Sequence, residues 1–391
     1  MPTVVVSPSN VANFVEGGGH FWVYMQYVQG LRALGCDVYW LERFRRRDNP
    51  LDDAAVLSTF FSQMERYGMG GRTILYRSPD DVHADPEARE YIGVTRQEAE
   101  AVIRRADLLL NFLYRIDPAL LARFRRTALV DIDPGLLQFW IGAGQLAVPP
   151  HDVYFTIGET VGTPGSRIGD CGLDWIHIRP PVTLDLWPTR SDPGGEAFTT
   201  VSSWYGGDGT GTGCEWIVAE NGTSYENTKR ISFLNFIELP RLIDQPLELA
   251  LCFGPEEATE RPLLARYGWR IRHANEVACS PERYHAYVRH SRGEFSCAKP
   301  SCLAFQNAWI SDRSLCYLAS GKPVVVQNTG PSAFLPVGEG IFRFNTIGEA
   351  AEAFAIINSD YEGHCRAARA IAEAYFDATK VASVILSRAL H

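Results

Sequence analysis

The stretch "GEFSCAKPSCLAFQNAWISDRSLCYLASGKPVVVQNTG", residues 293–330, contains the pattern that decides the fold. Ser311 is a good helix N-cap, and Asp312 follows in the first turn, where the helix dipole favours negative charge. Apolar residues then recur at helical spacing until Gly321, and an apolar strand covers 323–326. The stretch therefore predicts a helix–glycine–strand unit, with the helix start and the strand end at one edge of a sheet.

Outward from this unit, apolar strand-like runs alternate with helical patterns along the whole chain. Strands are predicted at 4–6, 38–41, 73–76, 108–110, 128–130, 153–156, 198–202 and 247–252. Helices are predicted at about 24–34, 51–67, 95–106, 226–243 and 281–291, and through most of 347–391. This alternation is typical of parallel sheets covered by helices on both faces. We therefore predict an α/β fold with two Rossmann-like, doubly wound domains.

The predicted domain boundary lies where this rhythm stops. Residues 179–197, "RPPVTLDLWPTRSDPGGEA", are rich in proline and glycine, and a chain of 391 residues exceeds what one core usually serves. We predict a first domain at 1–180, a linker at 181–196 and a second domain at 197–363. Ligands are expected at the carboxyl ends of the strands, in a cleft between the two halves.

Composition excludes several classes of partner. The net charge of −9 and the pI near 5.6 argue against nucleic acid or an anionic membrane as the main partner. No apolar run approaches the ~18 residues of a membrane span. The nine cysteines include no Cys-x-x-Cys pair, which is typical of reduced thiols in a cytoplasm and makes a zinc site unexpected. We expect a cytoplasmic protein without a metal ion or bound cofactor.

A glycine cluster and a histidine stand between the first strand and the first helix. In "VEGGGHFWVYMQYVQGLRALGCDVYWLE", residues 15–42, Gly17, Gly18 and Gly19 allow main-chain N–H groups to approach an anion or a hydroxyl. A purely structural turn explains the glycines as well. His20 follows at the helix start, where it is a candidate general base or a packing residue.

The helix predicted after Ser311 also offers groups for a nucleotide. Asp312 can receive ribose hydroxyls, while Arg313, Ser314 and the helix N–H groups can hold phosphate. Such a site would lie beside the end of the strand at 323–326.

Two segments resemble a known family. "CYLASGKPVVVQNTG", residues 316–330, resembles the "EAMASGxPVV" segment of nucleotide-sugar glycosyltransferases with the two-Rossmann (GT-B) fold. The glycine-rich segment 15–42 resembles the first loop, helix and second strand of that fold. The resemblance implies a nucleotide-sugar site in the second domain and an acceptor site in the first. It also implies that a closing helix, residues 364–391, returns to the first domain.

When the family's motif is aligned with this sequence position by position, the usual ribose ligand of the family is not present. The second glutamate of the family's Glu-x7-Glu pattern falls on Cys316, so Asp312, one turn earlier, is our substitute ribose ligand. The first glutamate is matched to Glu294, although its distance from Cys316 exceeds the spacing of that pattern.

The resemblance also implies diphosphate and sugar contacts. Lys229 and Lys299 are candidate diphosphate ligands, and surface lysines without a ligand are the alternative. Gln327 follows the last strand, where relatives hold donor-sugar hydroxyls. "SSWYGGDGTGTG", residues 202–213, is a candidate phosphate cradle or a mobile loop.

Two acids at strand ends complete the candidates. In "VDIDPG", residues 130–135, Asp131 and Asp133 could hold a divalent cation, but alternation on a strand separates them unless the strand ends between them. We favour Asp131 as a strand-end carboxylate that orients His20 or the acceptor. Glu159, in "FTIGET", occupies the same kind of position.

Together these features predict a metal-independent glycosyltransferase acting on a small natural product or a saccharide. Its partners would be a nucleotide sugar and this acceptor, without nucleic acid or an integral membrane segment. Two alternatives stay open: a nucleotide-sugar 2-epimerase on the same fold, and a non-catalytic two-lobed ligand-binding protein.

Overall fold

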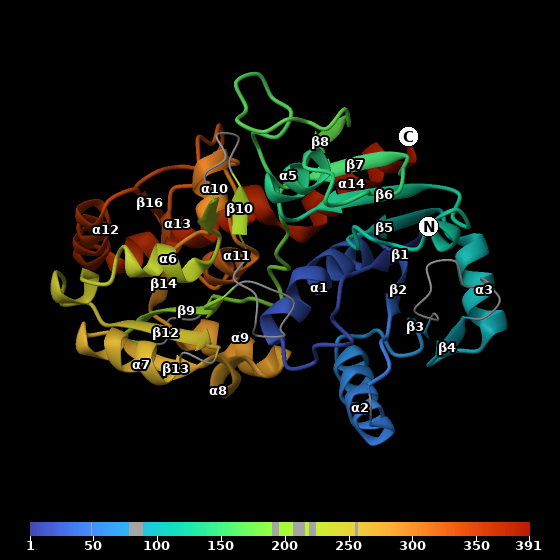
Figure 1. Cartoon of the computed structure of the whole chain (residues 1–391), viewed down its shortest axis with the longest axis horizontal. Helices are drawn as coiled ribbons and strands as arrows, with labels where there is room; N and C mark the ends of the chain where they lie inside the picture. Colours follow the sequence, from blue (N-terminus) through green and yellow to red (C-terminus); the bar gives the residue numbers. More distant parts are fainter. Residues whose placement is uncertain (48, 78–88, 190–194, 206–215, 219–223, 255–256) are drawn as a thin grey trace. The chain divides into compact units, whose positions relative to one another are not determined.

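The computed structural model describes the chain except for residues 48, 78–88, 190–194, 206–215, 219–223 and 255–256 (Figure 1). The chain forms two compact units. The first unit consists of Met1–Gly158, Gly169–Pro181 and Ala378–His391, and the second consists of Glu159–Ile168 and Val182–Asp377. The chain therefore passes between the units more than once, and each unit combines segments that are distant in sequence.

The first unit is built on an eight-stranded sheet in the order β4-β3-β2-β1-β5-β6-β7-β8. Its strands are β1 (Thr3–Ser7), β2 (Asp37–Arg43), β3 (Thr73–Arg77), β4 (Glu90–Ile92), β5 (Leu108–Asn111), β6 (Thr127–Asp131), β7 (Val153–Thr156) and β8 (Trp175–His177). Its helices are α1 (Gly18–Ala33), α2 (Pro50–Arg66), α3 (Arg96–Arg105), α4 (Pro118–Leu121), α5 (Leu136–Gly142) and α14 (Ala378–Leu390). β4 pairs antiparallel with β3 at the edge of the sheet, and the other described strand pairs of this sheet are parallel.

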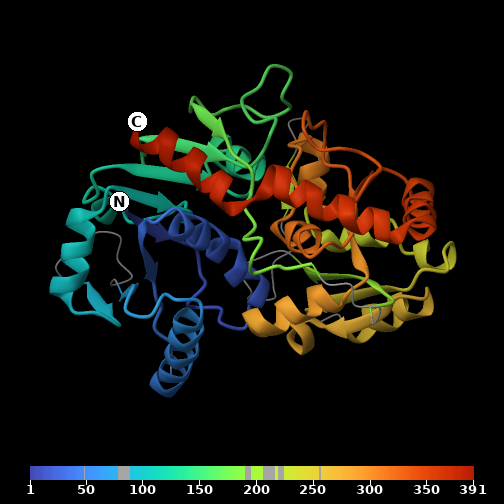
Figure 2. The ribbon, with the colours of Figure 1, turned by 180° about the vertical axis from the view of Figure 1, so that it is seen from behind.

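Alternating side chains place helices on both faces of this sheet. Leu41 packs in one cluster with Val102 and Ile103 of α3. The preceding residue, Trp40, points to the other face, where its ring meets Tyr24 of α1 and Phe60 of α2. The closing helix α14 packs along α1 (Figure 2). Both faces are thus covered, as expected for a mostly parallel sheet.

The second unit is built on a six-stranded parallel sheet in the order β13-β12-β9-β14-β15-β16. Its strands are β9 (Phe198–Ser203), β12 (Leu247–Cys252), β13 (Arg270–His273), β14 (Gly293–Ser296), β15 (Val324–Gln327) and β16 (Ile341–Phe344), with a separate hairpin of β10 (Trp216–Val218) and β11 (Ser224–Glu226). Its helices are α6 (Lys229–Leu234), η2 (Leu239–Arg241), α7 (Glu257–Arg266), α8 (Ala274–Ala278), α9 (Pro281–His290), α10 (Pro300–Phe305), α11 (Asp312–Ala319), α12 (Ile347–Ser359), α13 (Tyr361–Ile371) and η3 (Ala372–Phe376).

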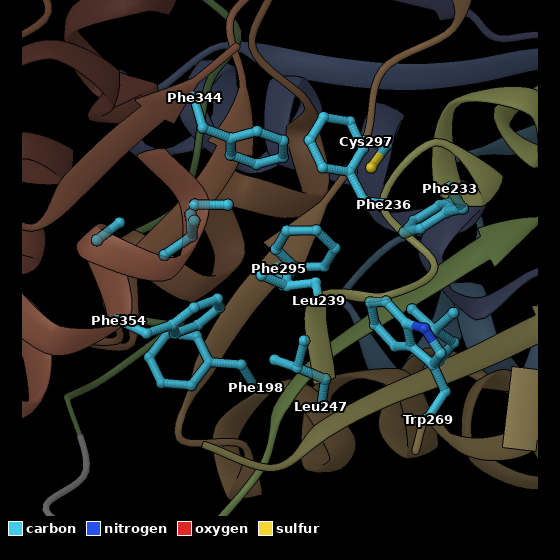
Figure 3. Packing of buried hydrophobic residues seen from close by; sticks show 14 of the residues in the cluster. Phe198, Phe233, Phe236, Leu239, Leu247, Trp269, Phe295, Cys297, Phe344 and Phe354 are labelled. Carbon is cyan, nitrogen blue, oxygen red and sulfur yellow. The ribbon is translucent and has the colours of Figure 1, made fainter. Parts of the chain in front are cut away.

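An aromatic cluster forms the core on one face of the second sheet (Figure 3). Phe295 of β14 lies at its centre: its ring stacks on Phe344 at 5.4 Å and packs against Trp269 and Phe354. Such contacts combine a large burial of apolar area with favourable ring geometry. The cluster fixes α6 and α12 on this face of the sheet.

The predicted doubly wound α/β class is confirmed. The prediction missed the short strands β4, β8, β10 and β11, and it missed three strands of the six-stranded sheet. β13 reads "RIRH" and is half-exposed at the sheet edge, so it has no apolar run. β14 reads "GEFS" and buries a glutamate and a serine, which hides it from a search for apolar residues. β16 was also not predicted. The helix expected at 226–243 is shorter than predicted and ends at Leu234.

The ends of the units differ from the expected boundaries. The expected returning segment began at residue 364, whereas residues up to Asp377 pack in the second unit and the first unit resumes at Ala378. Residues Glu159–Ile168 also pack in the second unit, although they follow the first-unit strand β7 closely. The linker expected at 181–196 includes residues 190–194, which lie outside the described residues.

Candidate functional site

The strand orders define one switch point in each sheet. In the first unit, β1 is followed by β2 and β3 on one side and by β5 on the other. In the second unit, β9 is followed by β12 and β13 on one side and by β14 on the other. Ligands of doubly wound sheets bind outside the carboxyl ends of the strands at such points.

A buried ion pair crosses the second switch point. Glu294 of β14 is fully buried, and its Oε1 accepts a hydrogen bond of 2.6 Å from Nε of Arg313, in the first turn of α11. Nη1 of Arg313 donates to the carbonyl of Val201 in β9 at 2.9 Å. The Glu294 carboxylate raises the pKa of Arg313 further above its ordinary value. Arg313 therefore ties α11 to both central strands. This pairing explains why β14 carries a buried glutamate on the face opposite Phe295.

Two lysines gather near this ion pair. Only four of the 37 basic residues are lysines. Two of these four lie at helix starts, Lys229 as the first residue of α6 and Lys299 as the N-cap of α10. The helix starts are linked because the side chain of Asn227 accepts a hydrogen bond of 2.8 Å from the N–H of Ser301. Burial, together with the positive charges of Arg313 and Lys299, lowers the pKa of Lys229 to about 7. The predicted diphosphate ligands thus lie close enough to repel one another.

The rest of the α11 start is buried to different degrees. Asp312 is half-buried, and burial raises its pKa while the charges of Arg313 and Lys229 oppose that rise. Ser314 is buried and its hydroxyl has no hydrogen-bond partner among the described residues. Cys316, at the position of the family's ribose glutamate, is also buried. Asp312 is therefore the more accessible oxygen ligand in this turn.

Gln327 supports the loop that carries Lys299. Its Oε1 accepts a hydrogen bond of 3.1 Å from the N–H of Ala298. The structure thus gives this side chain a contact within the protein, between the ends of β14 and β15. The predicted contact to donor-sugar hydroxyls remains a prediction for the rest of its amide group.

Trp309 is a site residue that the sequence analysis missed. Its ring lies 6.0 Å from the ammonium of Lys229. Its loop is fixed by left-handed backbone at Gln306 and Ala308, with φ of 52° and 57°, and by a 2.6 Å hydrogen bond from the Thr329 hydroxyl to the Trp309 carbonyl. Gly330 permits this loop, because a Cβ there would lie 2.6 Å from the Gln306 carbonyl oxygen. The Thr329-Gly330 pair after the strand was the available signal.

The glycine loop of the first unit fixes His20. Gly17 caps α1, and a Cβ on it would lie 2.4 Å from the Phe14 ring, while Gly18 and Gly19 form the first residues of the helix. Nε2 of His20 lies 2.7 Å from the carbonyl oxygen of Ser9. A carbonyl only accepts, so Nε2 carries the proton and Nδ1 is the basic nitrogen. Burial lowers the pKa of His20, which favours the neutral ring.

A second residue that the sequence analysis missed, Glu42, holds the same loop. Its side chain is buried at the end of β2, where it accepts hydrogen bonds from the N–H of Ala12 at 2.8 Å and from the Trp40 indole at 2.9 Å. Burial raises the pKa of Glu42 to about 7. Its position inside a strand-like run concealed it in the sequence.

Asp131 is fully buried in a hydrogen-bond network. Its Oδ2 accepts from Gln138 at 2.9 Å and from Thr156 at 2.8 Å, and its Oδ1 accepts from the N–H of Asp133 at 3.0 Å. Burial raises its pKa to about 7. β6 ends at Asp131, and Asp133 is exposed. The carbonyl that orients His20 belongs to Ser9, whereas the hydrogen bonds of Asp131 hold its own turn.

Glu159 binds a loop of the second unit. Its carboxylate accepts hydrogen bonds from the Ser332 hydroxyl at 2.7 Å and from the N–H of Ala333 at 2.5 Å. The structure therefore brings together Lys229, Lys299, Asp312, Arg313 and Glu294, and it places Glu159 and Asp131 in separate networks.

Three further sequence predictions concern features that the structure describes only in part. Most of the loop 202–213 lies outside the described residues. Across the described part of the chain, no group of three or more His, Cys, Asp or Glu side chains has a metal-binding arrangement. Within the same residues, every helix is too short or too polar to cross a bilayer.

Comparison with solved structures shows the fold. An alpha-glucosyltransferase bound to UDP and a 13-mer DNA superimposes with a TM-score of 0.60 at 11% identity, covering 100% of both chains. HepE from Anabaena, bound to UDP, has a TM-score of 0.53 at 11% identity over 99% of both chains. Sucrose-phosphate synthase from Thermosynechococcus elongatus has a TM-score of 0.52 at 11% identity, covering 99% of this chain and 98% of that one.

These likenesses establish the two-Rossmann GT-B architecture for the whole chain. No protein-family model matches the sequence, and no curated protein matches it either.

Proposed function

We propose that the protein is a glycosyltransferase that moves a sugar from a nucleoside-diphosphate sugar to a soluble small-molecule or saccharide acceptor. The observation that carries the proposal is the cluster of Lys229, Lys299 and Arg313 at the switch point of the second sheet. The GT-B architecture and UDP in the structures of similar enzymes support it. The second unit would bind the donor and the first unit the acceptor.

The lysines suit a leaving diphosphate. Lys229 is held where its ammonium is destabilised by burial and by two neighbouring cations. An incoming diphosphate supplies the missing negative charge, and more charge develops on it as the sugar departs, so preorganised cations favour the transition state. Arg313, held by Glu294, would add a third positive charge close to the two lysines. These residues let the reaction proceed without a metal ion, and full activity in EDTA is the expected result.

His20 would serve the acceptor. Its proton on Nε2 is directed at Ser9, which leaves Nδ1 to remove a proton from an acceptor hydroxyl. Asp312 would hold the donor ribose. We therefore expect Asp312→Ala to weaken nucleotide-sugar binding by at least about tenfold, the equivalent of one charge-assisted hydrogen bond, while His20→Ala leaves it unchanged.

The test begins with a calorimetric titration of the full chain with UDP, GDP and TDP sugars. Because the pKa of Lys229 is about 7, a bound diphosphate should draw up to one proton onto it above that pH. Titration in buffers of different ionisation enthalpy measures this uptake. Lys229→Met should lose the uptake and weaken binding by about 10- to 100-fold, since a charged hydrogen bond contributes about 1.5–3 kcal/mol.

Lys380→Met is the matched control, because Lys380 is exposed on α14 in the other unit. Equal affinity and equal proton uptake in both variants would remove Lys229 from the donor site. Release of nucleoside diphosphate only when an acceptor is added separates a transferase from an epimerase and from a binding protein. Release that ignores every acceptor would count against the transferase.

A further inference from the structure

One aromatic ring in the described part of the chain is exposed, and it lies beside His20. Phe14, in the loop between β1 and α1, is 45% exposed. Every other Phe, Tyr and Trp whose side chain the structure describes is buried or half-buried. The ring centroids of Phe14 and His20 lie 6.2 Å apart, with 52° between the ring planes. The first unit therefore presents an uncovered aromatic ring next to the proposed base.

A single exposed apolar side chain is ordinary on a protein surface, but the turn around Phe14 holds this ring in place. The N–H of Phe14 donates to the carbonyl of Val11 at 3.1 Å, and the carbonyl of Phe14 accepts from the N–H of Gly17 at 2.9 Å. A Cβ on Gly17 would lie 2.4 Å from the Phe14 ring. Glycine at this position therefore makes room for the ring, which gives the first glycine of the cluster a structural reason.

The residues before and after Phe14 are fixed to other elements of the first unit. The side chain of Asn13 donates to the carbonyl of Arg43, at the end of β2, at 2.9 Å. The carbonyl of Val15 accepts from the side chain of Gln63 in α2 at 3.2 Å, and Val15 itself is buried. The backbone cannot turn the Phe14 ring inward without breaking these contacts. A ligand that covers the ring therefore gains the free energy of burying its apolar area.

The His20 ring is fixed as well. Its Nε2 donates to the carbonyl of Ser9, and the ring meets Tyr24 edge to face at 5.3 Å. A hydroxyl that gives its proton to Nδ1 must come within about 2.6–3.2 Å of that nitrogen. Because the Phe14 ring is only 6.2 Å from the His20 ring, the atoms that carry this hydroxyl come within reach of Phe14. The two rings therefore face parts of one bound acceptor.

We propose that the acceptor is a ring compound that lays a flat apolar face on Phe14 while its reacting hydroxyl meets His20. This inference rests on the proposed function, because it names the acceptor class of that site. An aromatic acceptor offers such a face for stacking. A sugar offers one through the C–H groups on one side of its ring. An open-chain polyol offers hydroxyl groups without a flat face, so Phe14 selects against it.

The test uses the full chain saturated with UDP, so that the donor site is occupied. Hydroquinone, methyl β-glucoside and glycerol all carry hydroxyls, and they provide an aromatic ring, a sugar ring and no ring. In ligand-detected NMR titrations at least one ring compound should bind saturably, and glycerol should not. Phe14→Ala should weaken that binding about 2- to 10-fold, the range of one aromatic stacking contact, and Phe14→Tyr should restore it. Leu34→Ala is the control, since Leu34 is 42% exposed in the same unit.

The other outcomes separate the two kinds of ring and the two proposals. Weakening for only one of the ring compounds identifies the acceptor ring as aromatic or as a sugar. Unchanged binding in Phe14→Ala, an equal loss in Leu34→Ala, or no binding of either ring compound would overturn the inference and leave the proposed function standing. In transfer assays Phe14→Ala should raise KM and keep kcat, and a fall in kcat alone would reduce Phe14 to a support of His20. Failure of all nucleotide sugars to bind would overturn the proposed function, and ring binding to the chain without UDP would still be measurable.

Discussion

At the scale of single residues, the same side-chain type has different roles in different surroundings. The sequence singled out Asp131, Glu159 and Asp312 because each acid stands at a strand end or a helix start, and the family resemblance added Glu294. The structure gives Asp131, Glu159 and Glu294 internal donors and leaves Asp312 half-buried beside Lys229. A sequence shows where a carboxylate stands along an element, but its hydrogen-bond partners come from distant segments. This is why the grouping of Lys229, Lys299, Asp312 and Arg313 at one sheet edge was predictable and their hydrogen-bond partners were not.

Asp131→Asn tests whether that carboxylate is structural. Whichever way the new amide turns, its NH₂ faces a donor, either the N–H of Asp133 or Nε2 of Gln138. Gln138 cannot turn to compensate without losing its hydrogen bond of 2.6 Å from the N–H of Gly135. We expect the free energy of unfolding to fall by about 1–3 kcal/mol, the cost of a mismatched buried donor.

Urea unfolding of this variant measures the loss, with Asp133→Asn as the exposed control. The pH dependence gives a second check. A folded pKa of about 7 against 3.8 means that the folded state keeps a proton which the unfolded state has lost, so stability falls as pH rises through this window. Asp131→Asn should remove that slope. Full stability together with lost activity would restore a catalytic role.

At the scale of elements, apolar periodicity predicted the long helices and the central apolar strands. It missed β14, because only one of its four residues, Phe295, belongs to the apolar core, while Glu294 pairs with α11. The boundary of the closing helix depended on packing as well. α14 lies against α1, and Gly30 provides the close approach: a Cβ at Gly30 would lie 2.4 Å from the carbonyl oxygen of Ala378. No periodicity in either helix reports that contact.

Gly30→Ala is therefore expected to reverse the usual effect of this substitution. Alanine in a helix interior normally stabilises by about 0.5–1 kcal/mol relative to glycine. Here the added methyl group would force α14 away from α1, and overpacking of this kind costs about 1–3 kcal/mol. Gly142→Ala, at the end of α5 with nothing within 4 Å of the new Cβ, is the control and should be neutral or stabilising. A stabilised Gly30→Ala would show that the two helices do not pack as described.

At the scale of the whole molecule, the pattern of strands and helices predicted two doubly wound units, but not the repeated passage of the chain between them. The cores are made of different residues, with Leu41 and Val102 in one cluster and Phe295 and Phe344 in another. A ligand that binds only the folded second unit should therefore stabilise the transition in which the Phe295 cluster unfolds.

This prediction is testable by calorimetric unfolding of three proteins with and without UDP. Phe295→Ala should lower the transition of the second unit by about 3–5 kcal/mol, the usual cost of truncating a core phenylalanine. UDP at about 100 times its dissociation constant should raise that same transition by about 2.7 kcal/mol. Gly30→Ala should lower the other transition, which UDP leaves in place. If UDP instead raised the transition that Gly30→Ala lowers, the donor would bind in the first unit, and the assignment of Lys229 and Lys299 to it would be wrong.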